Sequence, residues 1–205
     1  MKSDPFKALL FVAGLVLAPA ARASVPTPAV VPSLDCRSAT TSRVEELVCK
    51  DERLASLDSK LARVLVDAQA KAVKERPPLL RASQRRWIRE RNDCWKKKAQ
   101  RECVEQSYRL RIAELQARYR LVPGNGPISY RCDGMRNGTV VVTFFRTEPP
   151  TLIARRGEQT SLMFIQASAS GSKYQSQNES LWEHQGEATI VWGRGSSPMR
   201  CQPGS

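Results

Sequence analysis

The sequence changes character at "LVPGNGP", residues 121–127. Clusters of proline, glycine and asparagine end helices and form short linkers. Between residue 24 and this stretch there is no glycine, and alanine, leucine, arginine, lysine and glutamate predominate; after it, glycine, serine, threonine and valine are frequent. We therefore predict an α+β protein with two segregated domains, a helical one over residues 24–121 and a β domain over residues 128–205, joined by a linker over residues 122–127.

The first domain carries apolar residues at helical spacing. In "RLASLDSKLARVLVDAQAKA", residues 53–72, apolar positions recur at three- and four-residue steps, which places them on one face of a helix. These positions are Leu54, Leu57, Leu61, Val64, Leu65 and Ala68. The Pro77-Pro78 pair must end this helix, because proline lacks the N–H and disfavours helical geometry in the residue before it.

Two more helices are expected before the linker. One runs from about Leu79 through Trp87 toward Cys94. The other carries Val104, Tyr108, Ile112, Leu115 and Tyr119 on one side. Together with residues 53–72 they predict a disulfide-stapled helical hairpin or three-helix unit.

The second domain alternates between strand and turn signals. Short runs of β-branched and aromatic residues occur in "TVVVTFF" (139–145), "SLMFIQ" (161–166) and "EATIVW" (187–192). Turn-forming residues separate such runs at roughly ten-residue intervals. This pattern predicts a small antiparallel barrel or sandwich.

The chain begins with the features of a secretory signal peptide. Lys2 and Lys7 supply positive charge, an apolar run extends over residues 8–18, and Ala21-Arg22-Ala23 is a small-x-small cleavage signal. The run is too short for a membrane-spanning helix, which needs about 20 residues. We therefore expect residues 1–23 to be removed and the mature chain to be periplasmic or secreted, soluble and without a membrane span. The first cysteine is Cys36, too far along to serve as a lipid-attachment site at the cleavage point.

Export makes the cysteines interpretable. There are six, namely Cys36, Cys49, Cys94, Cys103, Cys132 and Cys201. In an oxidising compartment they indicate three disulfides, whereas one histidine and no Cys-x-x-Cys count against zinc. A Cys132–Cys201 bond would tie the first and last strands of the β domain together, contributing about 4 kcal/mol in the chain-entropy model. The pairing within the helical domain stays open.

The positive charge lies mainly in the helices. The formal net charge is +13, and residues 24–127 hold 22 basic against 13 acidic residues, while residues 128–205 hold 8 against 6. Clusters such as "RASQRRWIRERNDCWKKK" (81–98) can neutralise phosphates, but export and disulfides argue against nucleic acid as the partner. Anionic polymers of a cell envelope are the alternative partners for such a surface.

Nothing in the sequence indicates catalysis. No Ser-His-Asp set, conventional metal motif or phosphate-binding loop is recognisable. We therefore expect no catalytic residues, no metal and no cofactor, and predict that the protein is not an enzyme.

The helical domain resembles the LprI-like secreted module. The resemblance lies in "LDCRSATTSRVEELVCKDERLASLDSKLA", "QRRWIRERNDC" and "CVEQSYRLRIAEL". The matching positions are Asp35, Cys36, Cys49, Asp51, Leu54, Leu57, Asp58, Gln84, Arg85, Trp87, Arg91, Cys94, Cys103 and Arg111. It implies a module associated with lysozyme inhibition. We expect Trp87 to lie in the core and Asp58 and Arg91 to form a hydrogen-bonded pair.

The β domain resembles the MliC/PliC family of bacterial envelope inhibitors of c-type lysozyme. The resemblance lies in "YRCDG", "SASGSKY" and "LWEHQGEAT", followed by a late cysteine. It implies an eight-stranded antiparallel β-barrel. The family's Ser-Gly-x-x-Tyr motif falls on Ser170, Gly171 and Tyr174, and its tryptophan on Trp182. His184 stands where the family has lysine.

The resemblance implies how the protein would inhibit. A lysozyme cleaves glycan with two carboxylates that line a cleft. Ser170 would donate a hydrogen bond to one of them, Gly171 would supply the turn, and Tyr174 and Trp182 would brace the loop or pack on the cleft wall. His184 would donate a hydrogen bond or carry a charge, and Glu179, Glu183 and Glu187 would form an acidic rim. The alternative function is an envelope-binding or assembly module that contacts anionic polymers through the helical domain.

Overall fold

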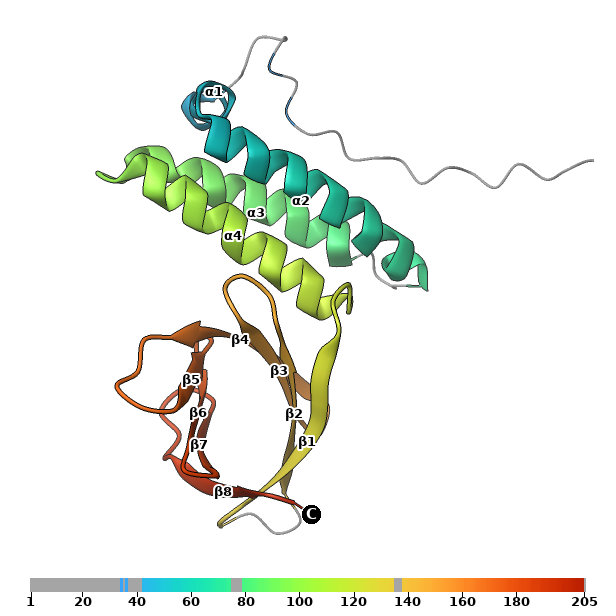
Figure 1. Ribbon diagram of the computed structural model, residues 1–205, viewed down its shortest axis with the longest axis vertical. Coiled ribbons are helices and arrows are strands. Elements are labelled where there is room, and N and C mark those ends of the chain that lie inside the picture. The colour runs from blue at the N-terminus through green and yellow to red at the C-terminus, as the bar shows by residue number, and fades with distance from the viewer. Residues whose placement is uncertain (1–33, 35, 37–41, 75–78, 135–137, 205) are drawn as a thin grey trace, which may run out of the picture.

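The computed structural model describes residues 34, 36, 42–74, 79–134 and 138–204, in which a helical domain lies against one side of a β-barrel (Figure 1). The α-helices are α1 (Arg43–Lys50), α2 (Glu52–Lys71), α3 (Leu79–Asn92) and α4 (Gln100–Arg118), with 3-10 turns at Ala72–Lys74 and Asp93–Lys96. The predicted signal peptide, residues 1–23, lies outside the described residues. None of the helices in the described ranges has both the length and the apolar character that crossing a bilayer requires.

Helix α1 is an element that apolar periodicity does not predict. The sequence nevertheless indicates where this helix begins, because Ser42 and Glu45 have the Ser-x-x-Glu spacing of a capping box. The Ser42 side chain accepts a hydrogen bond from the backbone N–H of Glu45. Asp51 caps α2 in the same way, and its pKa is lowered by the Leu54 N–H and by the Arg101 guanidinium.

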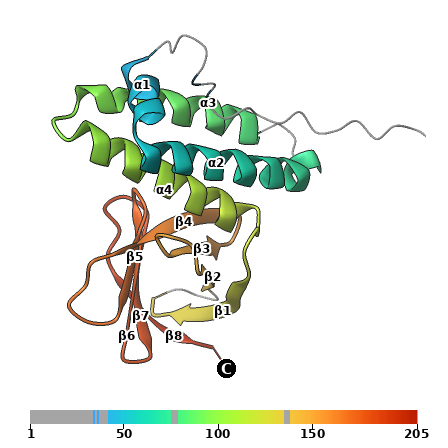
Figure 2. The same cartoon turned by 45° about the horizontal axis from the view of Figure 1, so that its top comes forward.

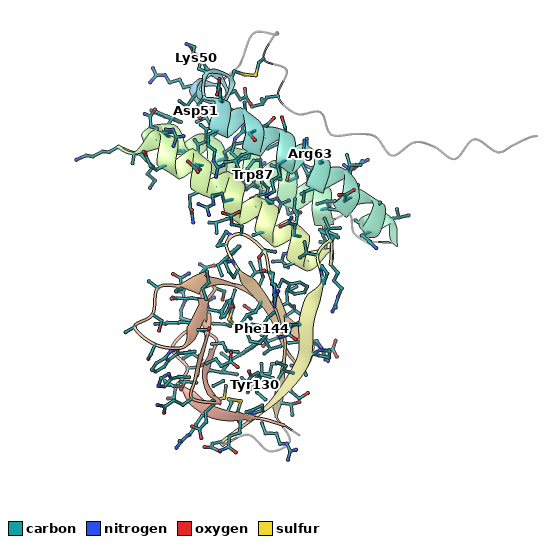
Figure 3. The ribbon with its side chains drawn as sticks, viewed as in Figure 1. Lys50, Asp51, Arg63, Trp87, Tyr130 and Phe144 are labelled. Atoms are coloured by element: carbon teal, nitrogen blue, oxygen red, sulfur yellow. A yellow bond between two sulfur atoms is a disulfide. The ribbon has the colours of Figure 1, made fainter. Side chains whose placement is uncertain are left out.

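The predicted helical faces form the core of the domain. All six apolar positions of residues 53–72 are buried, as are Val104, Tyr108, Ile112 and Leu115 of α4. Two disulfides, Cys36–Cys49 and Cys94–Cys103, confirm the stapled helical module and settle the pairing that the sequence left open. Trp87 lies in this core, as predicted, and its indole N–H donates to the carbonyl of Ser107 (Figure 3).

Asp58 and Arg91 are joined through a third residue. The Tyr108 hydroxyl donates to Asp58 Oδ1 at 2.9 Å and accepts from Arg91 Nη1 at 2.8 Å. The predicted direct pair is therefore replaced by a bridge, because the tyrosine ring reaches between the two side chains. Burial raises the pKa of the Tyr108 hydroxyl, so that it stays protonated and able to donate.

The second domain is a closed antiparallel barrel in which each strand pairs with the next and β1 pairs with β8. Its strands are β1 (Gly124–Cys132), β2 (Thr139–Phe145), β3 (Thr151–Arg156), β4 (Gln159–Gln166), β5 (Ser172–Gln175), β6 (Glu179–His184), β7 (Glu187–Trp192) and β8 (Met199–Pro203). Cys132 and Cys201 face each other across β1 and β8 and form the predicted disulfide. The structure thus selects the eight-stranded barrel over the sandwich.

Alternate residues of the strands fill the barrel. Val140 and Val142 of β2 and Ala188, Ile190 and Trp192 of β7 are buried in this way. Figure 3 shows Tyr130 among the side chains inside the barrel.

The stretch predicted as a linker, residues 122–127, belongs largely to β1. Gly124 pairs with Phe145 and Asn125 with Phe144, so the barrel ladder begins six residues after α4 ends at Arg118. The observed connection is shorter than predicted because a Pro/Gly cluster ends the helix but does not prevent the next residues from pairing as a strand.

The two domains share an apolar contact. Ala117 of α4 packs with Phe145 and Leu162 of the barrel, and Val122 and Ile153 border this cluster. An ion pair of 3.0 Å between Arg109 and Glu148 lies at the same junction. Figure 2 shows α4 lying along the barrel beside β3 and β4. The helical domain therefore rests on the barrel through α4.

The Tyr108 bridge gives a stability prediction. Tyr108→Phe removes the hydroxyl and leaves the buried Arg91 guanidinium without that partner, so the free energy of unfolding should fall by about 1–3 kcal/mol. Urea denaturation followed through the helical circular dichroism signal measures this. Tyr174→Phe is the control, since no hydrogen bond of the Tyr174 hydroxyl occurs in the described part of the chain. Equal losses in both variants would contradict the bridge.

Candidate functional site

The connection between β4 and β5, residues 167–171, forms an exposed loop, hereafter the 167–171 loop. It projects from the side of the barrel in Figure 1, beside the strands β5 and β6. Ser170 and Gly171 lie at its end, directly before β5 begins at Ser172. The loop is a polar surface segment, and its shape depends on two contacts with β6.

The first contact is the close approach of Gly171 to the β6 backbone. Gly171 has a φ of +67°, in the left-handed region that glycine adopts without steric cost. A Cβ atom at this position would lie well under 3.0 Å from the carbonyl oxygen of Glu183. Both the backbone angle and the available space therefore require glycine here.

The second contact is a hydrogen bond from Trp182 to the loop. The indole N–H of Trp182 donates to the carbonyl oxygen of Ser170 at 3.0 Å, and the Ser168 hydroxyl donates to the same oxygen at 2.6 Å. Within the described residues the Ser170 hydroxyl itself makes no hydrogen bond. The loop is thus held by its backbone, and the Ser170 side chain is left available to another molecule.

Trp182 and His184 form an aromatic pair on the outer face of β6. Their rings are stacked, with centroids 5.4 Å apart and an interplanar angle of 13°. Trp182 is among the exposed large hydrophobic side chains of the described chain. The pair borders a hollow of about 280 Å³, whose other lining residues are Gln185, Glu187, Thr189 and Arg200. This surface offers flat apolar area next to hydrogen-bonding groups.

The predicted acidic rim is not present. The Glu179 carboxylate accepts from the hydroxyls of Ser161 and Ser176, and the Glu183 carboxylate accepts from the buried Tyr130 hydroxyl. These two glutamates share the face of β6 that carries the buried Leu181, because side chains alternate along a strand. They therefore lie on the opposite face from Trp182 and His184.

The third glutamate, Glu187, is paired with a cation. Arg200 Nε lies 2.6 Å from its carboxylate, and this hydrogen bond lowers the pKa of Glu187 while raising that of Arg200. The Glu187–Arg200 ion pair therefore adds no net charge to the hollow beside the aromatic pair. Arg200 reaches the hollow because β8 pairs with β7, which places Arg200 opposite Thr189. The sequence alone does not give this strand register, so it does not reveal Arg200.

Tyr174 lies apart from the other predicted contact residues. Its side chain is buried, and its ring meets that of Phe144 edge to face at 5.6 Å. Burial, followed by the nearby Glu183 charge, raises the pKa of the Tyr174 hydroxyl. The structure therefore brings Ser170, Gly171, Trp182 and His184 together at the surface, while Tyr174 supports β5 from inside the barrel.

The described residues hold no group of three or more histidine, cysteine, aspartate or glutamate side chains placed to bind a metal ion. All six cysteines are in disulfides. The groups present at the 167–171 loop and on the outer face of β6 are the Ser170 hydroxyl and the stacked rings of Trp182 and His184.

Both halves of the chain match known families. The model for membrane-bound lysozyme-inhibitor of c-type lysozyme (MliC) matches residues 130–198, and the model for lysozyme inhibitor LprI matches residues 36–115. Lipoprotein LprI from Mycobacterium bovis and from Mycobacterium tuberculosis are each 31% identical to this chain over 170 residues, which cover 82% of this chain and 83% of theirs. Among solved structures, Pseudomonas aeruginosa MliC in complex with hen egg white lysozyme is 22% identical, covering 40% of this chain and 90% of that one with a TM-score of 0.31.

A matched pair of glycine variants tests the loop geometry. Gly171 and Gly186 both have positive φ, but a Cβ at Gly186 would meet nothing within 4 Å. Gly186→Ala should cost only the left-handed backbone term of about 1–2 kcal/mol, whereas Gly171→Ala must also displace the β6 carbonyl. We expect Gly171→Ala to give the larger drop in thermal unfolding temperature and faster amide exchange in β5 and β6. A similar drop in both variants would show that the contact with Glu183 does not constrain the loop.

Proposed function

Since the chain belongs to the LprI family, we propose that it inhibits c-type lysozyme by inserting the 167–171 loop into the enzyme's cleft. The two family models that match its halves are both named for lysozyme inhibition. These matches favour a non-catalytic inhibitor.

The observation that carries this proposal is the free hydroxyl of Ser170 on a loop fixed by its backbone. The carboxylates of a lysozyme cleft accept hydrogen bonds, and a bond to a charged acceptor is about twice as strong as a neutral one. Because Trp182 and Ser168 already hold the Ser170 carbonyl, little conformational freedom is lost when the hydroxyl docks. The loop presents no glycosidic bond, so a lysozyme that binds it has nothing to cleave.

The aromatic pair supports the same docking surface. Tryptophan is enriched among the residues that contribute most to protein–protein binding, because it buries a large area with few rotatable bonds. Trp182 lies at the base of the loop, where its indole N–H is bonded to the Ser170 carbonyl. Stacking on His184 further restricts the orientation of the Trp182 ring. We infer that both rings pack against the rim of the cleft when Ser170 is inside it.

The disulfides and the names of the relatives support an envelope or extracellular compartment. Three disulfides are characteristic of chains that fold outside the reducing cytoplasm. The mycobacterial relatives are named lipoproteins, and the MliC family is described as membrane-bound. We infer that this protein works in the cell envelope or outside the cell, where it would meet lysozyme.

Removing the Ser170 hydroxyl tests the proposed contact. Ser170→Ala should weaken inhibition of c-type lysozyme by about ten- to a hundredfold, because a hydrogen bond to a charged group contributes roughly 1.5–3 kcal/mol. The inhibition constant is measured by titrating the variant into a cell-wall turnover assay. Ser197→Ala, at an exposed serine of the β7–β8 connection, is the matched control and should leave the constant unchanged. An unchanged constant in a folded Ser170→Ala variant would rule out the serine as donor.

The second functional test concerns His184. Histidine side chains as a class change charge between about pH 5 and 8, whereas lysine remains charged there. If position 184 pairs with a lysozyme carboxylate, His184→Lys supplies a permanent cation and should bind at least as tightly as the wild type near pH 7.5. His184→Ala removes every polar group at this position together with the ring that stacks on Trp182, so it should bind more weakly than either. Equal affinities for all three proteins across the pH range would leave this position without a contact role.

A further inference from the structure

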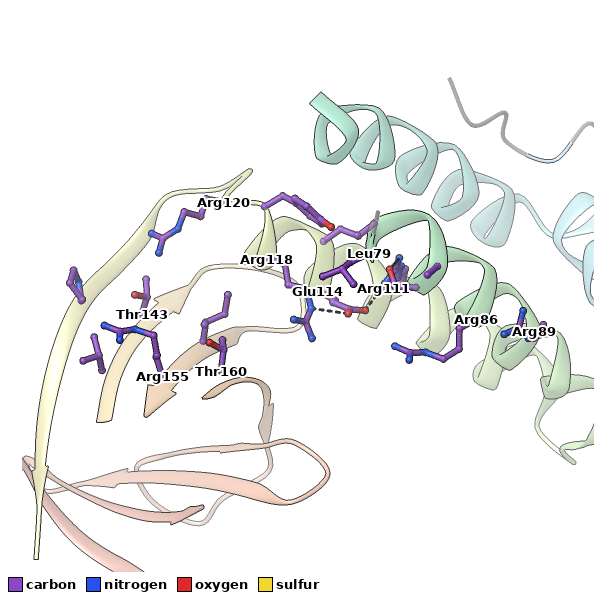
Figure 4. Close-up of a pocket in the computed structure, with 17 residues that line it drawn as sticks. Leu79, Arg86, Arg89, Arg111, Glu114, Arg118, Arg120, Thr143, Arg155 and Thr160 are labelled. Atoms are coloured by element: carbon purple, nitrogen blue, oxygen red, sulfur yellow. Dashed lines mark hydrogen bonds and ion pairs between the residues drawn. The ribbon is translucent and has the colours of Figure 1, made fainter. Parts of the chain in front are cut away.

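A large cleft lies between the two domains, away from the 167–171 loop. Its volume is about 900 Å³, and it is bounded by α3 and α4 on one side and by strands β1 to β4 on the other (Figure 4). Six arginines line it, namely Arg86, Arg89, Arg111, Arg118, Arg120 and Arg155. We call this site the interdomain cleft; it shares no lining residue with the loop or the aromatic pair.

The positive charge of the interdomain cleft is poorly compensated. Glu114 is the single acidic residue in its lining, against six arginines, and it binds Arg111 at 2.9 Å and Arg118 at 3.0 Å. Glu90 pairs with Arg86 at 3.7 Å, but both side chains are about two-thirds exposed, and such surface pairs contribute little. The lining of the cleft therefore carries an excess of positive charge.

The remaining three arginines, Arg89, Arg120 and Arg155, have no carboxylate partner among the described residues. They come from separate elements: α3, the turn after α4, and β3. Within the described residues, the Arg155 guanidinium donates a single long hydrogen bond, 3.4 Å, to the carbonyl of Gly157. Each of these three arginines therefore adds positive charge that no carboxylate of the described chain offsets, and an anion long enough to reach them would reduce this excess charge.

The base of the cleft is rigid. The Arg111 side chain is 2% exposed and is fixed by hydrogen bonds of 3.0 Å to Gln84 Oε1 and to the Ser83 hydroxyl. Thr143 and Thr160 add hydroxyl groups on the barrel side, where Figure 4 shows them beside Arg155. The site thus combines one fixed guanidinium with neighbouring exposed ones.

We propose that the interdomain cleft binds a soluble anion carrying several phosphate groups, such as a segment of a phosphate-bearing polymer. Guanidinium groups bind phosphate oxygens through paired N–H donors, and arginines from both walls could each take a separate group. Several anionic groups are needed to match the excess charge. A flat bilayer surface cannot enter a cleft recessed between two domains, so the ligand is a chain and not a membrane.

Titration calorimetry on the full chain tests this proposal with long-chain linear inorganic polyphosphate as the probe. The wild type should bind it, and Arg89→Gln combined with Arg155→Gln should weaken binding by at least about tenfold, since two charge-assisted contacts are lost. The control combines Arg81→Gln with Arg85→Gln, which removes the same charge from exposed α3 positions outside the cleft. The control should bind within about twofold of the wild type.

Three results would overturn the proposal. They are no binding by the wild type, equal weakening in both double variants, and capture by phosphatidylglycerol vesicles that depends on Arg89 and Arg155 while polyphosphate does not bind. Lysozyme inhibition by the Arg89/Arg155 double variant should equal that of the wild type, because the cleft does not include the proposed inhibitory loop. Loss of phosphate binding and loss of inhibition are therefore separable, and each proposal can fail without the other.

Discussion

The pairing of β1 with β8 is the constraint on which the rest of the molecule depends. It closes the barrel, and the Cys132–Cys201 disulfide makes the closure covalent at a point of direct register. Because β1 follows α4 after a short connection, the same strand also fixes where the helical domain ends. Closure therefore sets the position of β6 beneath the 167–171 loop and the position of α4 against the barrel, and these two positions create the loop surface and the interdomain cleft.

The two domains divide the charge and the contact chemistry between them. The barrel presents a loop and an aromatic pair with little net charge, since Glu187 is matched by Arg200 and the other β6 glutamates face inward. Five of the six arginines at the interdomain cleft come from the helical domain and the turn after α4. The barrel supplies the sixth, Arg155. The excess positive charge lies at the junction of the two domains, because residues of both domains line the cleft.

Much of the fold could be predicted from the sequence, since helical and strand periodicities differ and the Pro/Gly cluster separates them. The run "TVVVTFF" shows the limit: its strand was predicted correctly, but it is apolar on both faces because Phe145 packs outward against α4. Periodicity alone does not reveal such a neighbour. Similarly, motif matching selected Ser170 and Trp182, yet the hydrogen bond between them and the inward direction of Tyr174 required the strand register.

The Trp182 hydrogen bond ends on a backbone carbonyl and not on the serine side chain. Any amino acid at position 170 can therefore present the same backbone carbonyl to Trp182. The loop keeps its outline whichever side chain stands there. Shape and exposed chemistry are encoded at different positions: Gly171 and Trp182 specify the outline of the loop, and residue 170 supplies its exposed side chain. The side chain at position 170 can therefore change by a single substitution without rebuilding the loop.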